Sequence, residues 1–420
     1  MPNRTQWGRA ALWLVAAYSV AHFLYSGIYA AWQAAGGDFR SAFPGPLMFQ
    51  LAERWPSLNK EWIVPWFVDS KVIWNYGPVL HFLTVPLIFA PTKELAMTIV
   101  LLVNYALVAA TFVLWVRLLF GPRPAWVPML LIGCLWMNYY PLLEAIMGRE
   151  IELLEFFLVT AAVWALRHDR EGLAGAAVGV ATMTKFLPGI LLPYLLIKGY
   201  RRAFWVALAV CGALAGLAQW LLGFQHSLTF AVLGGEVGTR YFPTIYMRQA
   251  LINALYRMFA IVDSSQIEPV TLYPDALKLI GTVLQGAILA ATAWFIVRWR
   301  HSRLLELEVA LLLLVAMIIL PHANTYYFVF ALPALSLGVA VWLRQPEALG
   351  ALVKGALLGS ILLSGVLVPM RVLEPIFGMP GVIVARVWQL YSIPAFGIML
   401  AALVAVAVHQ GIRRMEPAGE

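Results

Sequence analysis

Apolar runs long enough to cross a membrane recur along this chain of 420 residues, with short polar loops between them. A helix needs about twenty apolar residues to span the hydrocarbon core of a bilayer. Hydrophobic residues make up 62% of the chain and charged residues 12%, whereas soluble domains carry about 25% charged residues. The sequence therefore predicts an all-α polytopic membrane protein, with residues 1–420 forming a single membrane-embedded domain.

The positions of the basic residues predict how the chain crosses the membrane. The candidate spans are 11–34, 95–117, 124–142, 150–166, 172–184, 187–197, 203–222, 276–298, 305–320, 325–343, 350–369 and 387–408. The basic junctions are Arg4/Arg9, Arg117/Arg123, Arg167/Arg170, Lys198/Arg201/Arg202, Arg298/Arg300/Arg303, Arg344/Lys354 and Arg413/Arg414. With twelve crossings all seven junctions fall on one side, and the positive-inside rule makes that side, with both termini, cytoplasmic.

Three segments do not fit a simple crossing. The stretch 76–91 is apolar but short, and prolines bracket it. A crossing there would invert every later loop, so we expect a re-entrant or interfacial helix on the outer side, where surrounding protein can bury its backbone. The segments 36–94 and 223–275 are expected to be outer loops with interfacial helices, and 409–420 to be a cytoplasmic tail.

Ionisable residues within or beside membrane spans usually face a cavity or one another. On this topology the outer edge collects Asp38, Asp69, Lys71, Arg149, Glu150, Lys185, Glu236, Arg240 and His322. The inner edge collects mainly basic anchors. We therefore expect any chemistry to lie on the outer side.

Two of these residues, Asp38 and Lys185, each have one structural and one functional interpretation. Asp38 follows Gly36 and Gly37, and it is either a helix cap or a general base in a partly apolar cleft. Lys185 lies in the sequence MTKFLP, between two short apolar runs. It is either an anchor that extends to the interface or a cation that holds a phosphate.

The remaining candidates also have two interpretations each. His322 and Asn324 follow a predicted span. They are either solvated loop residues or groups that form hydrogen bonds with phosphate or sugar. Arg149, with Glu150, Glu152 and Glu155 after it, has the spacing of an internal ion pair, although Glu155 lies deep enough to contact a sugar hydroxyl or carry a proton. Arg240 and Arg248 are loop residues or phosphate ligands.

Several kinds of site find no support in the sequence. Cys134 and Cys211 lie in apolar runs, without the spacing of a metal site or a redox motif. No nucleotide-binding motif is present, and the basic residues sit in the short junctions rather than in a nucleic-acid-binding patch. No cofactor is expected with certainty, and a divalent ion held by Asp38 and a second carboxylate is left open.

The order of several short motifs resembles a known family. They are GGDF after the first span, YGPVLHFLTVPLIF, MGREIELLEFFL, MTKFLPGILLPYLL and the late LPHANTYYF. This chain is similar to glycosyltransferase family 87 of the GT-C superfamily, which includes the polyprenyl-phosphomannose-dependent mannosyltransferases of mycobacterial glycolipid assembly. The resemblance runs over most of residues 10–345.

The resemblance implies a GT-C fold with an active site on the outer face of the bacterial plasma membrane. It implies a polyprenyl-phosphosugar donor, Asp38 as catalytic base, and functional roles for Lys185 and His322. Two departures matter, because the family commonly has Tyr-x-Pro-Pro at Tyr76 and Gly-Gln at Gly148 and Arg149. The second departure adds a positive charge, so the acceptor or the sugar can differ.

The resulting hypothesis is inverting transfer of a sugar, with mannose favoured, to a hydroxyl of a lipid or glycan acceptor. Asp38 and His322 are the predicted catalytic residues: Asp38 takes the proton, and His322 contacts the donor phosphate. Lys185, Arg240 and Arg248 bind the donor phosphate. The predicted substrate-binding residues are Asp69, Tyr76, Arg149, Glu150 and Asn324. The rival hypothesis is a transporter or flippase, with Arg149, Glu155 and Lys185 lining a pathway. Against it, the sequence has no inverted repeat.

Overall fold

The structure is a computed structural model, in which helices account for almost all of the described chain. It describes residues 4–36, 93–222, 249–261, 270–271, 274–302, 304–320, 323–365 and 391–415, together with residues 79, 82, 83, 86 and 90. Its helices are α1 (Arg4–Gly36), α5 (Lys93–Phe120), α6 (Trp126–Asn138), α7 (Tyr140–Gly148), α8 (Glu152–Arg167), α9 (Glu171–Thr184), η3 (Leu187–Ile190), α10 (Leu191–Ile197), α11 (Arg201–Leu222), α13 (Leu251–Met258), α14 (Pro274–Arg298), α15 (Leu305–Ile319), η4 (Thr325–Ala331), α16 (Leu332–Arg344), η5 (Pro346–Ala348), α17 (Ala351–Ser364) and α20 (Ile393–Met415). The two-residue strands β1 (Ala260–Ile261) and β2 (Val270–Thr271) pair antiparallel.

A helix, or a helix broken in two, lies at each of the twelve predicted spans. Judged by length and composition, five helical segments of the described chain can cross a membrane, or six if the bent pair of α6 and α7 counts as one span. The all-α prediction is therefore confirmed, whereas twelve crossings remain a prediction. α20 continues to Met415, so the first residues of the expected tail are helical.

The bend between α6 and α7 is 56° and has a local cause. Pro141 has no amide hydrogen with which to continue the helix from α6, and Tyr139 between the two helices is extended. The amide of Tyr140 donates instead to the carbonyl of Gly365, at 2.7 Å. A side chain at Gly365 would collide with the ring of Tyr139, so the glycine makes this close approach feasible.

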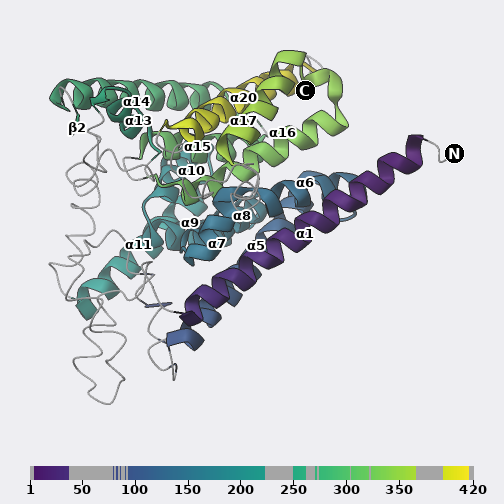
Figure 1. The fold of residues 1–420 in the computed structure, drawn as a ribbon. Helices are drawn as coiled ribbons and strands as arrows, with labels where there is room; N and C mark the ends of the chain where they lie inside the picture. The colour runs from purple at the N-terminus through teal and green to yellow at the C-terminus, as the bar shows by residue number, and fades with distance from the viewer. Residues whose placement is uncertain are drawn as a thin grey trace.

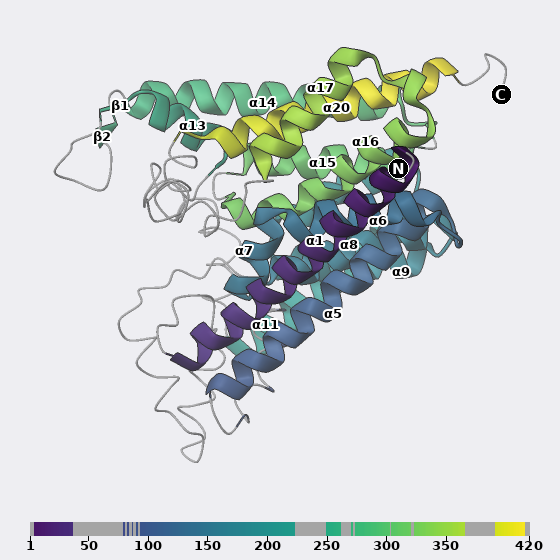
Figure 2. The ribbon, with the colours of Figure 1, turned by 45° about the vertical axis from the view of Figure 1, so that its right-hand side comes forward.

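The centre of the helix bundle is α15. Almost every residue of α15 is buried, as expected for a helix that is apolar on all sides and surrounded by protein. Figures 1 and 2 show α14, α17 and α20 on one side of it and α1, α5 and α11 on the other. The adjoining η4 is also buried throughout.

Contacts join the seven basic junctions into one face of the bundle, which we call the basic face. Trp13 near the start of α1 stacks on Trp126 at the start of α6, and Arg344 donates to the carbonyl of Leu119 at 2.6 Å. Ile412 of α20 lines a cavity of about 250 Å³ with Leu119, Arg344 and residues at the start of α15. Figure 2 shows the start of α1 and the end of α20 on the same side of the molecule.

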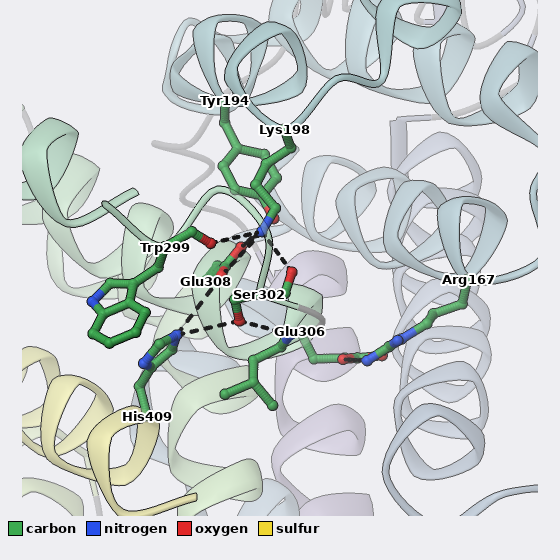
Figure 3. Close-up of polar contacts among 9 residues, drawn as sticks. Arg167, Tyr194, Lys198, Trp299, Ser302, Glu306, Glu308 and His409 are labelled. Atoms are coloured by element: carbon green, nitrogen blue, oxygen red, sulfur yellow. Dashed lines mark hydrogen bonds and ion pairs between the residues drawn. The ribbon is translucent and has the colours of Figure 1, made fainter. Parts of the chain in front are cut away.

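Ion pairs with two buried carboxylates, Glu306 and Glu308, complete the basic face (Figure 3). Arg167 forms two hydrogen bonds of 2.5 Å with Glu306. Lys198 lies 2.9 Å from Glu308 and donates to the carbonyls of Trp299 and Ser302. The prediction of basic anchors on this face is therefore incomplete, because the sequence pattern did not reveal the buried carboxylates with which two of these cations pair.

Candidate functional site

A second group of charged residues lies at the helix ends on the side of the bundle opposite the basic face. The turn between α7 and α8 carries Glu150, the break after α9 carries Lys185, and η4 begins at Thr325. α8 ends at Arg167 and α9 begins at Glu171, both at the basic face, and η4 leads into α16, which ends at Arg344 on the same face. The start of α8, the end of α9 and the start of η4 therefore lie on the far side of the bundle. We call this the site face.

Lys185 is held at the point where α9 stops. Its backbone is extended, with φ −156° and ψ 152°, and caps the helix. A 3₁₀ turn that contains Pro188 follows and leads into α10. The amino group pairs with the carboxylate of Glu152, the first residue of α8. Lys185 is only 7% exposed, so it is not a lipid-facing anchor.

Two tyrosines complete the surroundings of the Lys185 amino group. The ring centroid of Tyr327 lies 4.3 Å from it and that of Tyr326 lies 5.7 Å away. The two rings stack on each other. The negative faces of aromatic rings stabilise a cation without neutralising it. The site therefore keeps a buried positive charge that pairs with Glu152 and faces two aromatic rings.

Four carboxylates lie in the same region, and all four are held by α7, α8 or the turn between them. Glu150 is 7% exposed, and Glu152 and Glu155 are fully buried. Glu150 and Glu155 both interact electrostatically with Glu152 and Lys185, and Glu150 also interacts with Glu144. Glu144 receives a hydrogen bond from Thr325. The site therefore has an excess of acidic groups around one buried lysine.

The turn between α7 and α8 has a special backbone. The backbone of Arg149 has φ 57° and ψ 39°. This is the left-handed conformation, which residues other than glycine seldom adopt. The guanidinium of Arg149 donates to the carbonyl of Met147 at 3.1 Å, and burial lowers its pKa. A side chain at Gly148 would meet the carboxylate of Glu150 at 3.0 Å, so this glycine lets Glu150 fold back over the turn.

The predicted ion pair among Arg149, Glu152 and Glu155 takes a different form in the structure. Glu152 pairs with Lys185 from another helix, because the end of α9 lies against the start of α8. Asn324 donates to the hydroxyl of Tyr326 at 2.7 Å. The structure thus brings Lys185, Glu150 and the loop of Asn324 to the site face.

Other predicted site residues lie outside the described residues. They are Asp38, Asp69, Tyr76, Arg240, Arg248 and His322. From the predicted re-entrant segment 76–91 the structure places Val79, which packs with Met183 near the end of α9. Within the described chain no cluster of His, Cys, Asp or Glu has the arrangement of a metal site.

Sequence reasoning missed Glu144, Tyr326 and Tyr327 as members of this group, and it missed Glu152 as the partner of Lys185. Glu144 lies in the apolar stretch YPLLEAIMG, and a carboxylate there is costly enough to have marked it as a candidate. The tyrosines gave no such signal. Aromatic residues are frequent at membrane interfaces, and only the packing of η4 against α8 shows their role.

Comparison with known protein families matches residues 74–321 to glycosyltransferase family 87. No curated protein matches the chain closely enough to be counted as a relative. The matched region includes Arg149, Glu150 and Lys185, begins after Asp38 and ends one residue before His322. Because the match covers more than half of a helical chain with several apolar helices, this protein belongs to glycosyltransferase family 87, a family of membrane glycosyltransferases.

Proposed function

We propose that this membrane glycosyltransferase transfers a sugar, with mannose favoured, from a polyprenyl-phosphate-linked donor to a hydroxyl of a lipid or glycan. The observation that carries the proposal is Lys185, a buried cation on the site face, stacked against two tyrosines. Lys185 lies inside the region matched to the family. A fixed cation beside aromatic rings suits a phosphate attached to a sugar and an apolar chain.

The donor phosphate is the natural partner of Lys185. Charge develops on this phosphate as the glycosidic bond breaks, and a prepositioned cation stabilises that charge. Polyprenyl phosphate is a weakly basic leaving group, so no general acid is required of the protein. We propose three further phosphate ligands, namely His322, which the family resemblance implies, and Arg240 and Arg248, which lie in the second predicted outer loop.

Asp38 is proposed as the general base. It follows the end of α1 by two residues, and α1 begins at the basic face. The acceptor hydroxyl would lose its proton to Asp38 as it attacks the anomeric carbon, which inverts the configuration. Asp69, Tyr76, Arg149, Glu150 and Asn324 are proposed to orient the substrates.

The proposed setting is the plasma membrane of a bacterium, with the GT-C architecture and twelve crossings. The basic face would lie in the cytoplasm, according to the positive-inside rule. The site face would then lie outside, where lipid-linked sugars are used. The transporter hypothesis loses support because the chain belongs to a glycosyltransferase family.

Substitution of Asp38 tests the assignment of the base. Asp38→Asn should abolish sugar transfer from polyprenyl-phosphomannose while the protein stays folded. Asp169→Asn is the matched control, because Asp169 is an exposed aspartate in the turn between α8 and α9 at the basic face, and it should keep normal turnover. Normal turnover by Asp38→Asn would show that another group is the base.

A further inference from the structure

The bundle contains two buried lysine–glutamate pairs that look alike but differ in how completely they are satisfied. Lys185 ends α9 and pairs with Glu152 at the site face. Lys198 follows α10 and pairs with Glu308 at the basic face. In both pairs the side chains are almost fully buried. Comparing the hydrogen bonds of the two pairs therefore shows which pair is a structural contact and which has atoms left for another function.

The pair at the basic face is completely hydrogen-bonded (Figure 3). Both carboxylate oxygens of Glu308 contact Lys198, and the hydroxyl of Tyr194 donates to Glu308 at 2.8 Å. Lys198 also donates to two backbone carbonyls. A buried ion pair is stable when its remaining donors and acceptors are satisfied in this way. This pair has the features of a structural contact.

The pair at the site face is not completely hydrogen-bonded. The second carboxylate oxygen of Glu152 has no hydrogen-bond partner among the described residues, and neither oxygen of Glu155 has one. Buried polar atoms in native proteins nearly always have partners, so such exceptions call for an explanation. Here they lie beside the cation that we assign to the donor phosphate. These oxygens are hydrogen-bond acceptors, so a proton on a carboxylate or the hydroxyls of a bound sugar would satisfy them, whereas the phosphate itself would not.

The elements that pack near Glu152 carry the following titratable groups. Glu150, Glu155 and Lys185 influence it electrostatically, and Glu144 lies beside Glu150. Further titratable groups are Arg149 in the preceding turn, Tyr326 and Tyr327 of η4, and Tyr105 of α5, whose hydroxyl donates to Phe23. On α15, Glu306 and Glu308 pair with cations at the basic face. Lys185 is thus the cation that pairs with Glu152, whereas the guanidinium of Arg149 donates to the carbonyl of Met147.

We propose that Glu152 is a positioning residue that holds Lys185 in the empty enzyme and releases it to the donor phosphate, taking up one proton as it does so. This inference rests on the proposed donor. Lys185 exchanges one negative partner for another, and the displaced Glu152 stays buried beside Glu150 and Glu155. Neighbouring carboxylates do not all stay ionised once their cation is withdrawn, so Glu152 binds a proton from solvent. The net charge of the site is then the same before and after donor binding.

Proton uptake on binding makes donor affinity depend on pH. The phosphodiester of a polyprenyl-phosphosugar keeps a single negative charge between pH 6 and pH 8, so the donor does not titrate in this range. If one proton is bound with each donor, the dissociation constant should rise by up to about tenfold for each unit of increasing pH. The protein alone is then the source of the pH dependence.

The experiment is binding of short-chain polyprenyl-phosphomannose to the full-length protein in nanodiscs, measured by calorimetry. Runs in buffers with different ionisation enthalpies give the number of protons taken up. We expect about one proton per donor in the wild type, in keeping with a rise of about tenfold per pH unit in the dissociation constant. Glu152→Gln should take up none, and its affinity should be nearly independent of pH.

The matched control is Glu306→Gln, which changes a carboxylate paired with Arg167 at the opposite end of the bundle. It should keep the proton uptake of the wild type. Donor binding by the wild type without proton uptake would overturn the inference, as would uptake that persists in Glu152→Gln. Loss of affinity in Glu152→Gln by the same factor at every pH would also overturn it, since that result indicates a purely structural role. Failure of the wild type to bind the donor would overturn the proposed function instead. The wild-type measurement decides the question even if Glu152→Gln does not fold.

Discussion

The amino group of Lys185 lies 4.3 Å from the ring centroid of Tyr327, which joins the end of α9 to the start of η4. This contact brings together two of the motifs by which the chain resembles its family, MTKFLP and LPHANTYYF. The cation at the centre of the candidate site is thus held partly by an aromatic face.

The contact predicts different results for two substitutions of Tyr327. Tyr327→Phe keeps the ring and should keep kcat/KM for the donor within about twofold. Tyr327→Leu removes a desolvated cation–π contact of about 1–2 kcal/mol, so kcat/KM should fall roughly five- to thirtyfold. Steady-state kinetics with a polyprenyl-phosphosugar measure both. Equal activity of Tyr327→Leu and wild type would show that the ring does not position Lys185.

Close packing of α9 against α11 gives a prediction about stability. A side chain at Gly175 would lie 2.2 Å from the carbonyl oxygen of Ala203, and one at Gly179 would lie 2.8 Å from that of Ala207. Small residues four positions apart let helices approach in this way. Gly175→Ala should therefore cost about 1–3 kcal/mol of stability through overpacking, measured by thermal unfolding in detergent.

Gly216 of α11 is the control for this prediction, because a side chain there would meet no atom within 4 Å. Gly216→Ala should unfold at or above the temperature of the wild type, since alanine favours the helix. If Gly175→Ala were as stable as Gly216→Ala, the two helices would not approach as closely as the structure shows.

The ion pair at the basic face should contribute to stability rather than to catalysis. Glu308→Ala leaves Lys198 buried without its carboxylate, which typically costs about 3–5 kcal/mol. The thermal unfolding midpoint should fall well below that of Glu347→Ala, a variant at an exposed position. Folded Glu308→Ala should retain its KM for the donor. A selective rise in KM would place Glu308 in the donor site.

Much of this fold follows from the sequence because a bilayer imposes a simple rule on apolar segments. A helix, or a helix broken in two, lies at each predicted span. The basic junctions that were predicted to share a face are joined by contacts such as that of Arg344 with Leu119. The breaks were harder to predict. The bend at Tyr139 depends on Gly365, a distant residue that leaves room for its ring, and local patterns carry no such information.

Labelling of single cysteines tests the orientation of the two faces. In a variant without Cys134 and Cys211, His301→Cys would mark the basic face and Phe259→Cys the opposite side, and both positions are exposed. A membrane-impermeant maleimide added to intact cells should label the cysteine at 259 and not that at 301. The reverse pattern would place the site face in the cytoplasm and contradict the outer location of the site.

The candidate site could be predicted only in part. Lys185 was identifiable because a lysine between two short apolar runs is costly in a membrane. Its partner was not identifiable, since Glu152 and Lys185 are 33 residues apart in the sequence. The spacing of three residues instead favoured Arg149 as the partner of Glu152. Tertiary packing decided the pairing, because α9 ends against the start of α8 and brings Lys185 to Glu152.

The most direct test of the account is whether the purified protein breaks the bond between a polyprenyl phosphate and its sugar. We predict that incubation with polyprenyl-phosphomannose and a membrane lipid extract as acceptor releases polyprenyl phosphate and yields an equal amount of mannosylated product. Asp38→Asn should produce neither. Movement of the intact donor across vesicle membranes, with no polyprenyl phosphate released, would contradict the account and favour a flippase.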